Sequence, residues 1–367
     1  NIKFFGFDKQ TCTVKIRNDF SFTNLNRYDF YYIIRDHGKE IYKGNIEKVN
    51  AAPGKTITSG FLKGIPKEKY TTGDVRIEFY AAIHAPEPFL PTSTVIAREQ
   101  TYIHTFFKQE APAQKLAASQ DATTQISFSG PDFRATFDKQ SGLLVSYQYK
   151  KHEYILDGQG PRPYFWRAPT DNDYGAQLPA KLKVWKEDSY QDLKAESFNV
   201  SKGNDSTTVK VTYRFPQTDA QWNITYKIYA NGIIKVNNKF IAEDNQAPMI
   251  PRVGLRMQLP ATFTTLTYYG RGPKENYRDR RTSQFIGEYT TLIRDMYEPY
   301  IRPQENNHRT DIYWCALMQN SKQGLLFIAD RTFELNASNY PLETLDSGES
   351  IHNAAPRTNE TVHRHLT

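Results

Sequence analysis

Short stretches in which apolar and polar residues alternate constrain the fold of this chain more than any other feature. In residues 75–79 and again in 209–213, every second residue is apolar and the residues between are charged or Thr. A period of two places successive side chains on opposite faces of a strand, so both stretches are predicted to be half-buried strands. The 24 Tyr and 22 Phe residues also favour strands. One short amphipathic helix is expected, around Leu182, Trp185 and Ser189, and the chain is predicted to be all-β.

Two further local signals refine this prediction. Asn231 and Gly232 separate two apolar-rich runs, which predicts a hairpin with a two-residue type I′ turn. Cys12 alternates with Val14 and Ile16 on one predicted strand face. With only one other cysteine, Cys315, the chain has no disulfide framework and no CxxC metal-binding spacing. Both cysteines are expected in the core.

The length of 367 residues predicts two domains. Gly and Pro punctuate the first hundred residues at the short spacing of a β-sandwich, which we place at 1–106. Residues 107–124 lack strand periodicity and are rich in Ala, Gln and charged residues, so we predict a linker there. Residues 125–367 form the second predicted domain.

Charge and hydropathy exclude several classes of protein. The net charge is +7, but 47 basic residues are interleaved with 40 acidic ones and form no basic stripe, so no nucleic-acid partner is expected. No apolar run approaches the roughly 18 residues needed to cross a bilayer, so no membrane partner is expected either. The first residues lack the pattern of a signal peptide, yet the chain is expected to start inside a fold. Its compartment, cytoplasm or periplasm, therefore stays open.

Segments 268–281 and 295–311 place charged, amide and aromatic side chains together between two β-like runs, where a plain core needs none of them. Such a mixture is typical of a surface that faces a sugar. Together with segment 166–175, they closely resemble the small-chain domain at the C-terminus of the large β-galactosidases of glycoside hydrolase family 2. Residues 1–106 resemble the immunoglobulin-like domain that precedes it in those enzymes.

The resemblance implies an immunoglobulin-like β-sandwich followed by a large antiparallel β-supersandwich similar to galactose mutarotase. It also implies a parent that hydrolyses terminal β-galactosides with retention, on a TIM barrel that this chain does not encode. The chain is therefore expected to be the C-terminal, non-barrel portion of such an enzyme, lacking the family's last strands. We expect it to support and help shape the sugar site and to be inactive in isolation.

Several expectations about ligands and partners follow from the same resemblance. The catalytic carboxylates belong to the barrel, so no catalytic residue is assigned to this chain. The Mg and Na ions that the intact enzyme often uses also belong to the barrel, so no metal or cofactor is expected here. The intact enzyme is expected to be a homo-oligomer whose partner is a β-galactoside.

A loop on the substrate side is the first candidate site. It contains Asp171, Asn172, Asp173 and Gly175. Oxygen-bearing side chains at a spacing of two resemble the start of a calcium loop, but the glycine comes one place too early for an EF-hand. The residues themselves favour a turn with Gly175 at positive φ. The resemblance instead implies a mobile loop that folds towards galactose, with Gly175 as its hinge.

Candidates for the sugar-facing surface are polar and aromatic residues of the resembling segments. They are Arg252, Glu275, Asn276, Tyr277, Glu305, Asn306, His308 and Arg309. Arg252 lies in 251–254, which resembles a short family signature, with structural ion pairing as the alternative. Glu275 and Glu305 have three interpretations: bonding to backbone amides or a nearby Arg such as Arg278, Arg280 or Arg309, contact with sugar, or a catalytic pair.

A different class of function stays open beside the galactosidase interpretation. A carbohydrate-binding module or an aldose mutarotase-like protein would also use a sandwich with a sugar-facing surface. A mutarotase needs a general acid and a general base, which Glu305, His308 and Arg309 supply if they converge.

Overall fold

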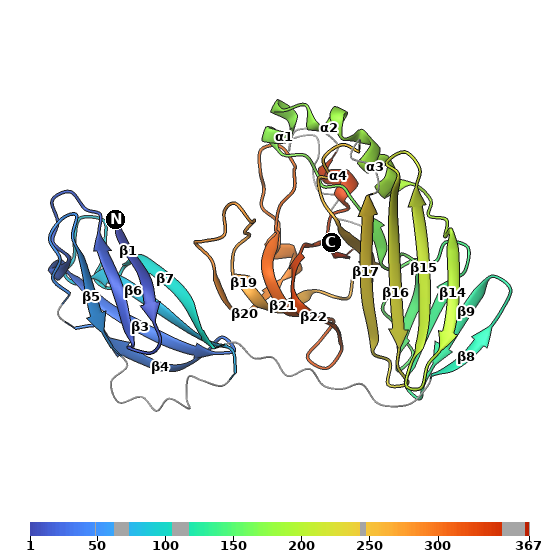
Figure 1. Ribbon diagram of the computed structural model, residues 1–367, viewed down its shortest axis with the longest axis horizontal. Helices are drawn as coiled ribbons and strands as arrows, with labels where there is room; N and C mark the ends of the chain where they lie inside the picture. The colour runs from blue at the N-terminus through green and yellow to red at the C-terminus, as the bar shows by residue number, and fades with distance from the viewer. Residues whose placement is uncertain (48, 62–72, 105–116, 243–246, 347–363, 367) are drawn as a thin grey trace. The chain divides into compact units, whose positions relative to one another are not determined.

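The computed structural model describes residues 1–367 except 48, 62–72, 105–116, 243–246, 347–363 and 367. The fold is all-β, as predicted, and the described helices are short. The chain divides into two compact units (Figure 1). One comprises Asn1–Gln109 with Phe285–Glu288, and the other comprises Glu110–Gln284 with Tyr289–Thr367. Among the described residues, no helix is long and apolar enough to span a membrane.

The described residues of the first unit form two antiparallel sheets. One has the order β1 (Ile2–Asp8), β2 (Thr13–Asn18), β5 (Thr56–Gly60). The other has the order β4 (Lys39–Asn45), β3 (Tyr28–Asp36), β6 (Val75–Ile83), β7 (Val95–His104). Both sheets contribute to one buried apolar cluster, which is the core of a β-sandwich.

The alternation in 75–79 is confirmed, with one addition. Val75, Ile77 and Phe79 are buried in the core. Glu78 is buried as well, and Arg35 on β3 donates a 2.9 Å hydrogen bond to its carboxylate. A buried charge needs such a partner to offset its lost hydration.

The predicted position of Cys12 is corrected. It precedes β2 at a φ of 50°, so it is not part of the alternating strand face. Val14 and Ile16 are buried as predicted, Cys12 is partly buried, and Cys315 is buried in the second unit.

In the second unit, the residues that the structure describes form four sheets. The first has the order β12 (His152–Glu153), β11 (Leu144–Tyr149), β10 (Phe133–Asp138), β9 (Gln125–Ser129), β8 (Ala118–Asp121), and the second runs β14 (Ser197–Lys202), β15 (Thr207–Phe215), β16 (Ala220–Ile228), β17 (Ile234–Ala242). The third runs β20 (Phe285–Leu292), β19 (Thr265–Gly272), β21 (Arg309–Met318), β22 (Gly324–Leu335). The fourth runs β13 (Arg162–Tyr164), β18 (Gly254–Leu259), β24 (Arg364–Leu366), β23 (Ala337–Ser338).

The core of this unit is rich in aromatic residues. The predicted alternation in 209–213 is confirmed on β15, whose buried residues pair with those of β16, such as Tyr213 with Trp222. Phe165 packs against Trp222 and Phe215, with ring centroids 5.6 and 5.0 Å away. These contacts fix the start of segment 166–175 to the sheet.

The segment ends in a short helix, α1 (Asp171–Gly175), and two more short helices follow it, α2 (Leu178–Lys181) and α3 (Lys183–Tyr190). The predicted amphipathic helix is confirmed as α3, which buries Trp185 and Ser189. A fourth helix, α4 (Leu342–Leu345), lies near the end of the described chain.

Part of the predicted linker, 107–124, is corrected. Residues 107–116 lie outside the described residues, but β8 occupies Ala118–Asp121 and pairs with β9. A polar strand at the edge of a sheet has both faces exposed, so it shows no apolar alternation by which the sequence reveals it.

The predicted hairpin exists, but its turn is different. β16 and β17 pair as far as Ile228 and Ile234, and the N–H of Tyr229 donates to the carbonyl of Ile233 at 3.0 Å, which leaves a three-residue connection, 230–232. The N–H of Gly232 donates to the carbonyl of Tyr229 at 3.0 Å, and Gly232 has a φ of 89°. Asn231 is not at positive φ, whereas a type I′ turn requires positive φ at both central residues.

Candidate functional site

Segments 166–175 and 295–311 meet in the structure although they are far apart in the sequence. The N–H of Glu305 donates to the carbonyl of Ala168 at 3.1 Å, and the N–H of Asp171 donates to Gln304 Oε1 at 3.3 Å. The guanidinium of Arg302 lies 4.6 Å from the centre of the Tyr174 ring. Two of the three segments singled out in the sequence are therefore joined directly.

The proposed turn at 171–175 is a helix. Thr170 caps α1 by accepting from the N–H of Asp173, and the Asp173 carboxylate accepts from the N–H of Thr170 at 2.9 Å, which makes a capping box. Asp173 also accepts from Arg167 at 2.8 Å. Gly175 is the last residue of this helix and is not at positive φ, so the predicted left-handed turn is wrong.

Asn276 holds the loop after β19 in place. Its side-chain amide donates to the carbonyls of Arg271 and Lys274, both at 3.0 Å. Its Oδ1 accepts from the N–H and the hydroxyl of Thr310, at 3.1 and 2.7 Å. Since Asn276 is fully buried with all these groups satisfied, it ties segment 268–281 to the start of β21.

Glu275 connects the same loop to segment 295–311. Its carboxylate pairs with Arg280 at 2.6 Å and accepts the N–H of Asn307 at 2.7 Å. The hydroxyl of Tyr300 also donates to it. Burial raises the pKa of Tyr300, and this hydrogen bond raises it further. These contacts fit the first interpretation of Glu275, in which it locks a long loop.

Glu305 is almost fully buried and forms an ion pair with Arg252. Its Oε1 also accepts from the side-chain amide of Asn336 at 2.8 Å. The structural alternative for Arg252, ion pairing, is thus present. Both carboxylates of the hypothetical catalytic pair are therefore engaged by arginines within this chain.

His308 shares Asn336 with Glu305. Nδ1 of His308 lies 2.6 Å from Asn336 Oδ1, and Nε2 lies 2.9 Å from the Glu334 carboxylate. The orientation of Asn336 follows from its amide, which donates to two oxygens. The hydrogen bond with His308 lowers the pKa of Glu334 to about 2, against a smaller opposing effect of burial.

Tyr277 and Arg309 complete the cluster. The ring of Tyr277 stacks on His308, with centroids 5.0 Å apart, and Arg280 lies 4.4 Å from its centre. Arg309 is buried and donates to the Tyr268 hydroxyl at 3.2 Å and to the Asn307 carbonyl at 2.9 Å. Arg309 thus closes the turn at the start of β21.

Three buried polar atoms of this cluster have no hydrogen-bond partner among the described residues. They are the hydroxyl of Tyr277, Oε2 of Glu305 and Oδ1 of Asn306. Burial raises the pKa of Tyr277, and the charge of Glu305 raises it further, so this hydroxyl stays a donor near neutral pH. Each of these atoms can form a further hydrogen bond, Tyr277 as a donor and Glu305 and Asn306 as acceptors.

Sequence reasoning missed several residues that complete the site. Glu334 lies at the end of β22 and Asn336 directly after it. Tyr300 and Gln304 lie within segment 295–311 but were not predicted as site residues. Asn336 and Glu334 lie in no unusual local pattern, so only their spatial position reveals them. In the described part of the chain, no group of three or more His, Cys, Asp or Glu side chains is arranged to hold a metal ion.

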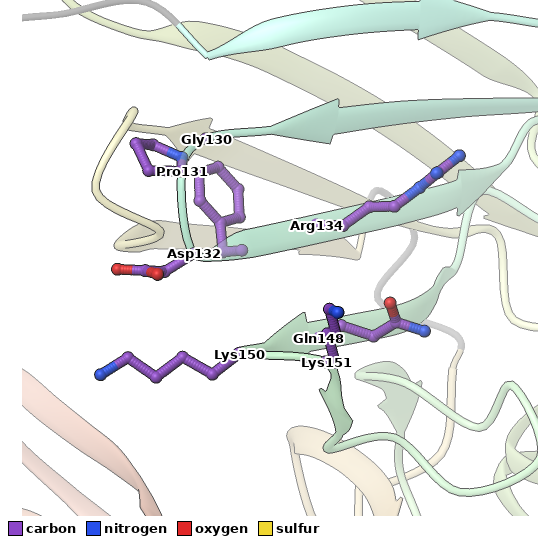
Figure 2. A pocket seen from close by; sticks show the side chains of 8 residues that line it. Gly130, Pro131, Asp132, Arg134, Gln148, Lys150 and Lys151 are labelled. Carbon is purple, nitrogen blue, oxygen red and sulfur yellow. The ribbon is translucent and has the colours of Figure 1, made fainter.

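Two shallow pockets lie outside the cluster of candidate residues. One, of about 370 Å³, opens over β10 and β11 (Figure 2). The other, of about 420 Å³, is lined by Trp166, α3 residues such as Lys186 and Tyr190, and Asp346. Glu275 and Glu305 line neither of them.

Comparison with known proteins matches both units. Residues 129–366 match the model of the family described as "Beta galactosidase small chain", and residues 14–104 match "Beta-galactosidase, domain 4". The chain is 29% identical over 353 residues to a β-galactosidase from Priestia megaterium, covering 94% of this chain and 33% of that protein. It is 30% identical over 330 residues to a β-galactosidase from Lactobacillus delbrueckii subsp. bulgaricus, covering 89% and 31%.

A third relative, the β-galactosidase of Clostridium acetobutylicum, is 30% identical over 281 residues, which cover 75% of this chain and 30% of that protein. The chain therefore spans about a third of the length of these relatives. The small-chain model alone matches well over half of the 367 residues. This chain belongs to the β-galactosidase small-chain family.

Proposed function

We propose that the chain is the C-terminal, non-barrel portion of a glycoside hydrolase family 2 enzyme that hydrolyses terminal β-galactosides with retention. Its role is to support and help shape the sugar site, while the catalytic carboxylates and the Mg and Na ions belong to a barrel elsewhere in the protein. Membership of the small-chain family supports this proposal, and so does the one-third coverage of relatives named β-galactosidase. The intact protein is proposed to be a homo-oligomer.

The architecture is part of the proposal. Residues 1–106 are an immunoglobulin-like domain, and residues 125–367 belong to a mutarotase-like domain that also includes β8. The sheet orders of the first unit, three strands against four, support the first assignment. The four antiparallel sheets of the second unit support the other.

The observation that carries the functional proposal is the joining of segments 166–175, 268–281 and 295–311 into one rigid cluster. Ala168 accepts a hydrogen bond from Glu305, and Glu275 accepts one from Asn307. Segment 295–311 is thus bonded to each of the other two segments. A support for a sugar site needs such pre-organisation, because side chains held in place lose little entropy when a ligand binds.

A mutarotase-like or carbohydrate-binding protein is the second candidate. Its specific support is that Glu305 and His308, the candidate acid and base, both form hydrogen bonds with Asn336. However, Glu305, His308 and Arg309 are all at most 6% exposed, and each is engaged by neighbours within the chain. A proton-transfer site must reach its substrate, so the supporting role fits these residues better.

The test compares this chain with the full-length protein on a chromogenic β-galactoside. We expect turnover by the full-length protein and none by residues 1–367 of this chain. Turnover by the chain alone that vanishes in Glu305→Gln would contradict the proposal. Accelerated anomer interconversion of galactose, followed by polarimetry, would instead establish the mutarotase candidate.

A further inference from the structure

A strained hairpin turn stands at one end of the first sheet of the second unit. β11 and β12 pair as far as Tyr149 and His152, so Lys150 and Lys151 alone form the turn. Their φ angles are 48° and 67°. Positive φ at both central residues is the property of a type I′ turn, a site that strongly favours Asn-Gly. Lysine is therefore an unfavourable residue at both positions, because side chains other than glycine rarely adopt positive φ.

The turn is held by one backbone contact from β10's side of the sheet. The N–H of Lys150 donates to the carbonyl of Asp132 at 2.6 Å. This contact needs no lysine side chain, and Asn or Gly would make it equally well. The fold therefore explains the turn but not the choice of lysines, and strain without a structural benefit points to a functional use of the side chains.

The two lysines line the pocket of about 370 Å³ shown in Figure 2. Other lining residues are Asp132, Phe133, Arg134 and Gln148. Arg134 and Gln148 pair across β10 and β11, so their side chains share one face of the sheet. In Figure 2 these two side chains extend to one side, whereas Asp132 and Lys150 extend to the other.

The lining carries three cationic side chains and one carboxylate. Both described hydrogen bonds of Arg134, to Ser127 at 3.2 Å and to Gln120 at 3.4 Å, are made by Nη2. Nε and Nη1 form no described hydrogen bond, and the guanidinium lies towards β9 and β8. Lys151 forms no ion pair with any residue in the described ranges, and Lys150 lies 5.5 Å from the centre of the Tyr149 ring.

We propose that this pocket binds an oxyanion, such as the carboxylate, sulfate or phosphate group of a small molecule. Arg134 and Lys151 supply positive charge, the amide of Gln148 supplies a neutral donor, and Lys150 lines the pocket with its side chain extending to the other side. Donors on a guanidinium and an ammonium suit an oxygen-bearing anion, because both form charge-assisted hydrogen bonds. The source of the oxyanion is either an inorganic ion or an acidic sugar. This site is independent of the proposed galactosidase role.

The experiment is an NMR titration of ¹⁵N-labelled protein at constant ionic strength, with sulfate, phosphate and glucuronate as probes and galactose as the neutral control. We expect saturable shifts of residues 130–134 and 148–151 with at least one anion and none with galactose. Tighter binding of glucuronate than of the inorganic ions assigns an acidic sugar, and the reverse order assigns an inorganic anion. No saturable binding of any anion overturns the proposal.

A matched variant separates the charge from the turn. Lys150→Asn with Lys151→Gly provides the residues that a type I′ turn prefers, so we expect its Tm to rise while anion affinity falls at least about tenfold. Lys151→Gln tests the charge alone and should also weaken binding. Lys210→Asn, an exposed lysine on β15, is the control and should bind as the wild type does. Unchanged affinity in the double variant, or an equal loss in the Lys210 control, contradicts the site.

Discussion

The indole N–H of Trp166 donates a 2.9 Å hydrogen bond to the carboxylate of Asp346, which lies 180 residues further along the chain. The same oxygen accepts an ion pair from Lys186 on α3 at 2.6 Å. Asp346 is therefore the point at which segment 166–175, α3 and the end of α4 are joined. Its side chain is only 5% exposed, so these hydrogen-bonding partners must compensate for the hydration that the carboxylate loses on burial.

Asp346→Ala should destabilise the protein by about 2 kcal/mol, because it leaves the indole N–H and the Lys186 ammonium without their acceptor. Urea unfolding measures the effect. Asp346→Asn keeps an acceptor for Trp166 but loses the ion pair, so it should cost less than the alanine variant. Equal stability of wild type and Asp346→Ala would show that the contact contributes nothing.

Gly175→Ala should leave the protein equally stable or stabilise it by about 0.5 kcal/mol. Gly175 is helical, and an added Cβ would meet no atom within 4 Å. Thermal melts check this. The hinge hypothesis is decided separately on the full-length protein: kcat and KM that change together at an unchanged Tm support a hinge, and unchanged kinetics remove it.

Removal of either Arg252 or Glu305 should cost about 3 kcal/mol, because each leaves its partner charged and buried. The double variant Arg252→Leu with Glu305→Leu should lose much less than the sum of the two single variants. A double-mutant cycle by urea unfolding measures this coupling. Additive losses would mean that the two side chains do not interact.

Glu334 should make stability depend on acidic pH. Its pKa in the folded protein is about 2, below the ordinary value of 4.5, chiefly because of the hydrogen bond with His308. A carboxyl whose pKa is lowered by folding stabilises the protein above pH 4.5, and this stabilisation is lost as the pH falls towards 2. Since the side chain is one-third exposed, we expect on the order of 1 kcal/mol.

Glu334→Gln should remove this component, so the free energies of unfolding of wild type and variant should differ more at pH 6 than at pH 3.5. Chemical denaturation at the two pH values is the measurement. Glu288→Gln, which removes an exposed carboxylate on β20, serves as the control. A constant difference between wild type and Glu334→Gln would contradict the assigned shift.

Cys315 should resist thiol reagents in the native protein. It is fully buried on β21, and burial raises the pKa of its thiol, so the reactive thiolate is scarce. Cys12 is partly exposed and should react first. Titration with a chromogenic disulfide should therefore show one fast thiol and a second one only after denaturant is added. Two fast thiols would show that the β21 core opens readily.

The all-β class, the alternating strands in 75–79 and 209–213, helix α3 and the family could all be predicted from the residues alone. The elements among these properties depend on residues that are neighbours in the sequence, because the period of apolar side chains follows directly from strand or helix geometry. The same reasoning failed where neighbouring residues say little. The polar edge strand β8 has no apolar face, and the two-residue turn formed at Lys150 and Lys151 rather than at Asn231 and Gly232.

The hydrogen bonds that hold the candidate site together could not be predicted from the residues and depend on the three-dimensional packing. Asn336 bonds both Glu305 and His308, and Asp346 bonds Trp166, yet neither residue lies in a recognisable local pattern. A hydrogen bond between residues far apart in the sequence depends on which donor and acceptor atoms the packed sheets bring within about 3 Å. The sequence places the polar residues in the right segments, and the packing of the sheets selects their partners, because a buried polar group must bond whatever the fold puts beside it.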